Sequence, residues 1–174
     1  EASRGRYAEG VEFQIGRIDM VANTGTYVDA PSHRWADGAD LAGLPLDRLA
    51  GREVVVVEAG GADAVGEDAF AGLDVGGKAV LVRTGWDRHW GTEAYLSGSP
   101  YLTAEAALGL VERGAAIVGI DSLNIDDLAD LERPVHSHLL RAGIPIVEHL
   151  TGLGAVPGAG ARFFAVPVKV RGMG

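Results

Sequence analysis

Residues 53–58 of this sequence read Glu-Val-Val-Val-Val-Glu, and this stretch decides the fold class. An apolar run without alternation is typical of a strand that is buried on both faces of a sheet, and valine favours such strands. Two comparable runs follow, Ala-Val-Leu-Val-Arg-Thr at residues 79–84 and Ala-Ala-Ile-Val-Gly-Ile at residues 115–120. These three buried strands are predicted to form the centre of the core.

Helical patterns lie between and after these strands. Residues 104–113 have Thr103 in the N-cap position and Gly114 at the C-terminal end, as helices commonly do. A second helix is predicted from about Pro134 to Gly143, because proline suits the first helical position. Further strands are predicted at residues 11–22 (one strand or a pair), 144–148 and 162–170. Strands that alternate with few helices, without a sequence repeat, predict a single α/β domain over residues 1–174 with a mixed sheet or flattened barrel.

Composition excludes several classes of function. The chain has 174 residues and a formal net charge of −9, which disfavours binding to nucleic acid. It contains no cysteine, so disulfides, thiolate nucleophiles and cysteine-ligated zinc are absent. No apolar run approaches the roughly 20 residues that span a bilayer, and the first residues lack the pattern of a secretory signal. We therefore expect an intracellular, cytoplasmic protein that acts on a small molecule and does not bind a membrane.

A polar stretch precedes the first of these buried strands: Asn-Thr-Gly-Thr-Tyr-Val-Asp-Ala-Pro-Ser-His at residues 23–33. If this stretch is extended, alternate side chains point to one face, which would carry Asn23, Tyr27, Asp29 and His33. The other face would carry small or β-branched residues that suit packing. An amide, a phenol, a carboxylate and an imidazole on one face predict a site strand. A plain turn followed by a surface histidine is the alternative.

A second group of polar residues lies in the C-terminal half. His136 and His138 fall near the start of the second helix, and Glu148 ends the following strand. Carboxylate oxygens and imidazole nitrogens are the ligands that zinc and manganese accept. The alternative is that each of these residues is a core group with its own hydrogen-bond partners, because glutamate is seldom buried without one.

Aromatic residues follow the strand at 79–84. Trp86 and Trp90 flank the sequence Asp-Arg-His and are assigned, with His138, to substrate binding; packing in the core is the alternative. Asp121, at the end of a buried strand, is a candidate to support the site or to cap a turn. A solvated acidic surface is predicted for Asp126, Asp127, Asp130 and Glu132.

These residues together resemble a known family. The stretch at 23–33 is similar to the signature His-x-Gly-Thr-His-x-Asp-x-Pro-x-His of the cyclase family of bacterial kynurenine formamidases and isatin hydrolases. The similarity continues, in order, at residues 81–86, 119–122, 135–140 and 143–150. The resemblance implies a swivelling β/β/α fold, assembly as a homodimer or homotetramer, and a site that uses zinc or manganese.

The sequence departs from this signature at both motif histidines, where it has Asn23 and Tyr27. The resemblance implies that Asp29, His136 and Glu148 are metal ligands and that His33 is the acid/base residue. Asparagine is a poor ligand for zinc, and tyrosine binds it well only as phenolate, whose ordinary pKa is about 10. We therefore expect at most one metal ion per chain, held weakly or absent.

Three functions remain open on these residues. The first is hydrolysis of a small amide, cyclic amide or ester, with a metal-activated water and His33 as acid/base. By resemblance, the default substrate of this arylformamidase-like reaction is N-formylkynurenine, an intermediate of tryptophan catabolism. The second is a metal-independent lyase or cyclase, in which Tyr27 and Asn23 donate hydrogen bonds to an oxyanion and His33 is the base. The third is a catalytically silent ligand-binding homologue.

Overall fold

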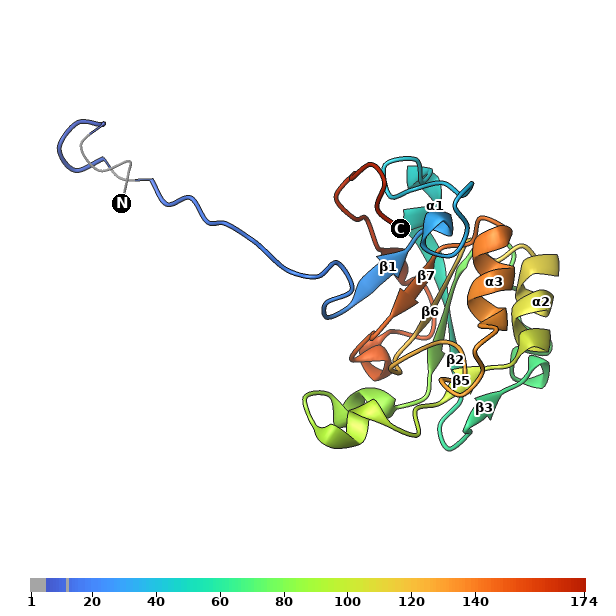
Figure 1. The fold of residues 1–174 in the computed structure, drawn as a ribbon. Helices are drawn as coiled ribbons and strands as arrows, with labels where there is room; N and C mark the ends of the chain where they lie inside the picture. Colours follow the sequence, from blue (N-terminus) through green and yellow to red (C-terminus); the bar gives the residue numbers. More distant parts are fainter. Residues whose placement is uncertain (1–5, 12) are drawn as a thin grey trace.

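The computed structural model describes residues 6–11 and 13–174, and its centre is a six-stranded sheet in the order β1-β7-β6-β4-β2-β8. The inner strands β2, β4, β6 and β7 are parallel to their neighbours in this group, whereas β1 and β8 join the two edges in antiparallel register. The strands are β1 (Tyr27–Asp29), β2 (Ala50–Glu58), β4 (Ala79–Arg83), β6 (Ile117–Ile120), β7 (Ile146–Glu148) and β8 (Arg162–Phe164). The predicted single α/β domain with a mixed sheet is confirmed, and the sheet is curled (Figure 1).

Two helices lie side by side on one face of this sheet (Figure 1): α2 (Ala104–Glu112) and α3 (Pro134–Arg141). The Thr103 hydroxyl accepts a hydrogen bond from the Ala106 amide at 3.2 Å, which is the predicted N-cap of α2. The remaining elements are α1 (Leu46–Leu49), the strand pair β3 (Ala64–Val65) and β5 (Tyr101–Leu102), and the short 3-10 helices η1 (Pro31–His33), η2 (Glu67–Phe70), η3 (Trp86–His89), η4 (Glu93–Leu96) and η5 (Leu153–Ala155).

The central strands are apolar on both sides because both faces of the sheet are covered. Along β4, Val80 and Val82 pack into the core beneath α2 and α3. Ala79 and Leu81 pack into a second cluster, on the other face, with Leu44 and other leucines of the loops. This period of two is what the β-pleat imposes on a buried strand. Strand β2 is less buried than its valines predict, since only Val57 has a fully buried side chain.

The two ends of the chain differ from the sequence prediction. Residues 11–22 were predicted to be one or two strands, but the described residues of this range form none, and residue 12 lies outside the described residues. They extend away from the domain (Figure 1), and Ile15 is 89% exposed. Strand β8 covers only Arg162–Phe164 of the range predicted to reach residue 170. An alternating apolar pattern is not sufficient for a strand, because the strand's backbone also needs a neighbouring strand as its hydrogen-bond partner. Within the described residues, no helix has the length and apolar character needed to cross a membrane.

Candidate functional site

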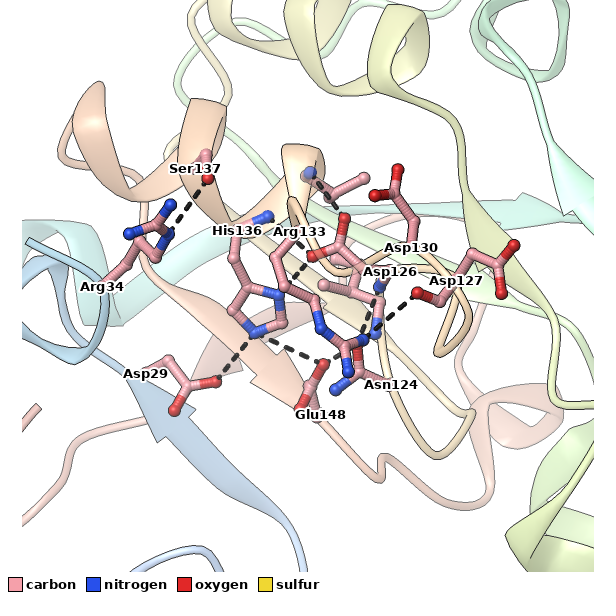
Figure 2. Close-up of polar contacts among 12 residues, drawn as sticks. Asp29, Arg34, Asn124, Asp126, Asp127, Asp130, Arg133, His136, Ser137 and Glu148 are labelled. Carbon is pink, nitrogen blue, oxygen red and sulfur yellow. Dashed lines mark hydrogen bonds and ion pairs between the residues drawn. The ribbon is translucent and has the colours of Figure 1, made fainter.

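Three elements bring the predicted ligands together. Asp29 ends β1, Glu148 ends β7, and His136 lies in the first turn of α3; their exposures are 0%, 1% and 6%. The antiparallel pairing of β1 with β7 places Tyr27 opposite Glu148 and Asp29 opposite Ile146. The Nε2 atom of His136 then lies 3.6 Å from Asp29 Oδ2 and 3.7 Å from Glu148 Oε1 (Figure 2). The sequence prediction of these three residues as one cluster therefore agrees with their positions.

A fourth residue, Asp126, was predicted to lie on a solvated acidic surface, and this prediction is wrong. The residue is 1% exposed, and its Oδ2 atom lies 2.6 Å from His136 Nδ1 (Figure 2). The same carboxylate accepts hydrogen bonds from the backbone amides of Val135, at 2.7 Å, and His136, at 3.0 Å. It satisfies amides of the first turn of α3, where no side chain at the cap position does so. A helix that begins at Pro134 without a local Ser, Thr, Asp or Asn cap was the signal that a more distant carboxylate was needed.

The His136 imidazole is surrounded by three carboxylates, those of Asp29, Asp126 and Glu148. Burial opposes protonation of the imidazole, but its contacts with Asp126 and Asp29 and the charge of Glu148 outweigh that penalty and raise its pKa to about 9. Burial also raises the pKa of Glu148. Three buried carboxylates around one imidazole form a site that favours a cation, because unpaired buried charge is costly.

The side chain of Asp29 has an oxygen without a partner. Asp29 Oδ2 is buried and accepts no hydrogen bond from the described residues, although it faces His136 Nε2. Nearby, Nδ1 of His33 lies 3.5 Å from Asp29 Oδ1. One ligand atom from each of Asp29, His33 and His136 lies within 4.8 Å of the others. This group differs from the predicted set in containing His33 in place of Glu148.

The predicted extended stretch is only partly extended. Strand β1 ends at Asp29, and residues Pro31–His33 form the 3-10 helix η1, so His33 does not reach the cluster by alternation along a strand. His33 lies beside Asp29, which is four residues before it in the sequence, because the 3-10 turn between them keeps the two residues close in space. Gly25 has a φ of 69°, which breaks the alternation on the other side. His33 and Asp29 are close to each other, as predicted, but the prediction that an extended strand joins them is wrong.

The two residues that replace the motif histidines are bonded to the cluster. The Tyr27 hydroxyl donates to Glu148 Oε2 at 2.5 Å, and Asn23 Nδ2 donates to Asp29 Oδ1 at 3.3 Å. The other Glu148 oxygen, Oε1, accepts from the backbone amide of Ile125 at 2.7 Å. Burial and the charge of Glu148 raise the pKa of Tyr27, so in the metal-free protein its phenol stays protonated and donates to Glu148. Both oxygens of Glu148 are thus occupied, in contrast to Oδ2 of Asp29.

Of the three residues predicted to bind substrate, Trp90 lies near His149 and Tyr27, whereas Trp86 and His138 have other surroundings. Trp90 is 46% exposed, and its ring lies 5.6 Å from that of His149, which in turn lies 5.2 Å from Tyr27. Trp86 instead donates from Nε1 to the Tyr95 carbonyl at 3.1 Å. His138 lies two residues after His136 on α3, which directs the two side chains to different sides of the helix.

His149 is a residue of the site that the sequence analysis did not assign. It has a φ of 57°, a left-handed conformation that few residues other than glycine adopt, and its Nδ1 lies 2.9 Å from the Tyr95 hydroxyl. Burial lowers its pKa, so it is a neutral ring near Tyr27. Asp121 supports the start of the aromatic loop, since its carboxylate accepts from the Thr84 and Gly85 amides, each at 2.8 Å.

Comparison with known proteins gives concordant results. The model of the Cyclase family matches residues 5–127. The kynurenine formamidase of Bacillus cereus is 28% identical over 143 residues, which are 82% of this chain and 67% of that protein. The kynurenine formamidase of Geobacillus thermodenitrificans is 30% identical over 150 residues, which are 85% of this chain and 70% of that protein. The chain thus spans about two thirds of the length of the curated relatives that it matches.

Solved structures have the same fold. A structure described as a potential metal-dependent hydrolase with cyclase activity superimposes with a TM-score of 0.76 at 34% identity, covering 90% of this chain and 76% of that chain. Isatin hydrolase A from Labrenzia aggregata superimposes with a TM-score of 0.74 at 26% identity, covering 86% of this chain and 68% of that chain.

Proposed function

Because the chain belongs to the Cyclase family, we propose that it is a metal-dependent hydrolase of a small amide or cyclic amide. The observation that carries the proposal is the buried Asp29 Oδ2 atom, which has no hydrogen-bond partner among the described residues and faces His136 Nε2. The names of the relatives, kynurenine formamidase and isatin hydrolase, support the hydrolysis of a C–N bond. An arylformamide such as N-formylkynurenine is the substrate that we propose.

The residues present fit a divalent metal. Asp126 holds the Nδ1 side of His136, which leaves Nε2 directed at Asp29, and a carboxylate in this position commonly orients a metal-ligating histidine. Asp29 and His136 would hold the ion, and zinc and manganese both accept such ligands. A bound ion of this kind supplies Lewis acidity to the amide carbonyl and to a water molecule.

Two arrangements can complete the site. In the first, which the sequence predicts, Glu148 is the third ligand and His33 transfers a proton to the leaving amine. The oxygen available for this is Glu148 Oε1, which lies 3.7 Å from His136 Nε2 and accepts one hydrogen bond, from the Ile125 amide, so that Oε2 keeps its bond with Tyr27. In the second, His33 is the third ligand, since its ligand atom already lies within 4.8 Å of those of Asp29 and His136.

The metal-independent lyase or cyclase is the second candidate function. It needs Tyr27 and Asn23 as donors to an oxyanion, but the single hydroxyl proton of Tyr27 is donated to Glu148. Tyr27 would have to leave Glu148, a buried acceptor, without its partner, which costs about 1–3 kcal/mol. The same bonds satisfy part of the cluster without a metal, and this is the observation that favours a silent ligand-binding homologue.

The surroundings of the site support contacts with an apolar, planar substrate. The Trp90 ring packs against the ring of His149, which in turn lies 5.2 Å from the ring of Tyr27. We propose that Trp90 contacts the substrate ring, as predicted. Trp86 and His138 remain predicted substrate contacts. We also propose a cytoplasmic homodimer or homotetramer, for which size-exclusion chromatography with light scattering is the measurement.

The experiment that tests the proposal measures metal content and amide hydrolysis on the same samples. Protein purified without chelator is analysed for metal per chain, and then assayed for release of formate from an N-formyl arylamine before and after treatment with chelator. Activity that chelation removes and zinc or manganese restores is the expected result. Asp29→Asn should abolish both metal and activity, whereas Asp130→Asn, whose carboxylate only accepts from the Glu132 amide, is the matched control. Hydrolysis that is unaffected by complete removal of metal would contradict the proposal.

A further inference from the structure

A small polar cavity opens beside the candidate metal cluster. It has a volume of about 260 Å³ and is lined by His33, Arg34, Asn124, Arg133 and His136. Two of these residues, His33 and His136, also belong to the cluster of ligand atoms around Asp29. The two arginines therefore lie at the same opening as the proposed metal, on a protein whose formal net charge is −9.

Arg133 is held toward this cavity by its backbone and by neutral acceptors. Its φ of 51° is in the left-handed region, which is unfavourable for a residue with a long side chain and persists where the surroundings hold it. One guanidinium nitrogen, Nη1, donates to Asn124 Oδ1 at 3.3 Å and to the Asp127 carbonyl at 3.2 Å. Its remaining nitrogens have no hydrogen-bond acceptor among the described residues, so the guanidinium retains free donors.

The acidic residues near Arg133 do not neutralise it. Within the described residues, no carboxylate oxygen lies within ion-pair distance of its guanidinium. Asp126 is bonded to His136, and Asp127 and Asp130 accept from the amides of Ala129 and Glu132, each at 2.9 Å. Figure 2 shows the carboxylates of Asp127 and Asp130 pointing away from Arg133. A cation that remains unpaired next to three acidic residues is available to an external anion.

Arg34 lies on another wall of the cavity and is exposed. Its Nε donates to the Ser137 hydroxyl at 3.2 Å (Figure 2). Its guanidinium lies 4.6 Å from the centre of the Trp35 ring. Stacking on the indole and bonding to Ser137 restrict the side chain without neutralising its charge. In the part of the chain that the structure describes, this arginine has no carboxylate partner either.

We propose that this cavity binds a carboxylate group of the substrate, so that the preferred substrate is an amide that also carries a negative charge. Guanidinium groups bind carboxylates through paired, charge-assisted hydrogen bonds, and Arg133 has the free donors for such a pair. A volume of about 260 Å³ is too small for a whole drug-sized ligand but accommodates a carboxylate with a few attached carbon atoms. The inference rests on the proposed hydrolase, since it places the charged end of the substrate beside the reacting amide.

Binding is tested without turnover, so that the subsite and the hydrolase are judged separately. The probes are N-formylphenylalanine and its neutral carboxamide, which differ only in the charged group, and their dissociation constants are measured by calorimetry on chelator-treated and on zinc-loaded protein. We expect the acid to bind at least about tenfold more tightly than the amide in both samples. Equal binding of the two probes to wild-type protein would overturn the proposal.

Variants identify the residue responsible for that preference. Arg133→Gln should raise the dissociation constant of the acid about tenfold and leave that of the amide unchanged, and Arg133→Lys should restore part of the difference. Arg34→Gln is the second variant, because its side chain is exposed and the substitution leaves the core intact. Arg141→Gln is the control: this residue is at the far end of α3, pairs with Asp37 at 2.9 Å and does not line the cavity.

Two outcomes distinguish the arginine subsite from the metal and from the hydrolase function. If the preference disappears on chelation but survives in Arg133→Gln and Arg34→Gln, the carboxylate binds the metal and not the arginines, and the proposal is wrong. If the preference follows the arginines while no amide is hydrolysed under any metal condition, the subsite stands and the hydrolase function fails.

Discussion

Asp126 and Asp29 approach the same imidazole from opposite sides, and their oxygens are bonded to very different extents. The carboxylate of Asp126 accepts from two backbone amides and from the His136 ring. Asp29 accepts only from Asn23, at 3.3 Å, and its Oδ2 has no donor among the described residues. A carboxylate whose two oxygens both accept hydrogen bonds stabilises the structure, whereas one with an unbonded, buried oxygen can bind a cation. Substitution of Asp29 and of Asp126 in turn tests this difference.

The largest effect is expected on the Asp29 side. Asp29→Asn removes the charge but nearly preserves the shape, so the ligand is lost and the fold is retained. Because loss of a residue behind a ligand already costs about 10–100-fold in metal affinity, we expect loss of the ligand itself to exceed about 100-fold. Equilibrium dialysis against buffered zinc measures this change. Unaltered affinity would mean that the metal, if bound, lies elsewhere.

His33 and Glu148 distinguish the two arrangements of the proposed site. His33→Ala should lower any turnover by about 10²-fold or more in both arrangements. If Glu148 is the third ligand, the variant keeps its metal; if His33 is, the metal is lost and Glu148→Gln keeps it. Metal per chain in the two variants, after the same dialysis, is the measurement. Near-normal turnover in folded His33→Ala would remove this residue from the mechanism altogether.

On the Asp126 side we expect a smaller loss of metal affinity and a loss of stability. Asp126→Asn weakens the support of His136, for an expected decrease of about 10–100-fold in affinity. It also leaves one of the amides of Val135 and His136 poorly satisfied, which costs about 1–3 kcal/mol in the free energy of unfolding. Urea denaturation of metal-free protein measures the second effect. Asp127→Asn, on the same loop, should change neither quantity.

Restoring both motif histidines should increase metal affinity on the Asp29 side of the cluster, where Asn23 and Tyr27 are poor ligands. The double variant Asn23→His, Tyr27→His supplies two imidazoles beside Asp29 and releases Glu148 from its bond to Tyr27. We expect an increase in zinc affinity of at least about tenfold, or about 1.4 kcal/mol. Two tightly held metals in the unaltered protein would instead show that Asn23 and Tyr27 already act as ligands.

The smallest effect is a dependence of stability on pH in metal-free protein. The pKa of His136 is raised from 6.5 to about 9, so the protonated ring stabilises the folded state fully below pH 6.5. This contribution is lost as the pH rises through 9. We expect the free energy of unfolding to fall by at least about 1 kcal/mol across this window. Denaturation at pH 6 and pH 9.5, with His136→Gln as the control that lacks the dependence, checks the sign.

The sequence was sufficient for the elements whose cause is local. The valine run of β2, the apolar run of β4 and the capped helix α2 all form where predicted, because burial and capping act within a few residues. The strand predicted at residues 11–22 does not form in the described part of that range. Its alternation was correct for a strand, but a strand also needs a neighbour, which no local pattern supplies.

The site shows the same limit. Asp29, His136 and Glu148 were predicted from their chemistry together with the family resemblance, and they lie together. Asp126 was assigned to the surface because its neighbours in sequence are acidic. Its role depends on a helix that begins eight residues later, and on amides that only the folded chain presents to it. His149 was missed for a similar reason: its contact with Tyr95 joins residues that are 54 positions apart.

The carboxylate of Asp126 makes the start of α3 and the candidate metal cluster parts of one cooperative unit. Any fluctuation that unwinds the first turn of α3 also releases the His136 ring, because both are bonded to the same side chain. Local unfolding of this turn would therefore take the candidate metal cluster apart at temperatures where the sheet is still intact. Amide hydrogen exchange at Val135 and His136 would report that event directly, and bound metal should slow it in proportion to its occupancy.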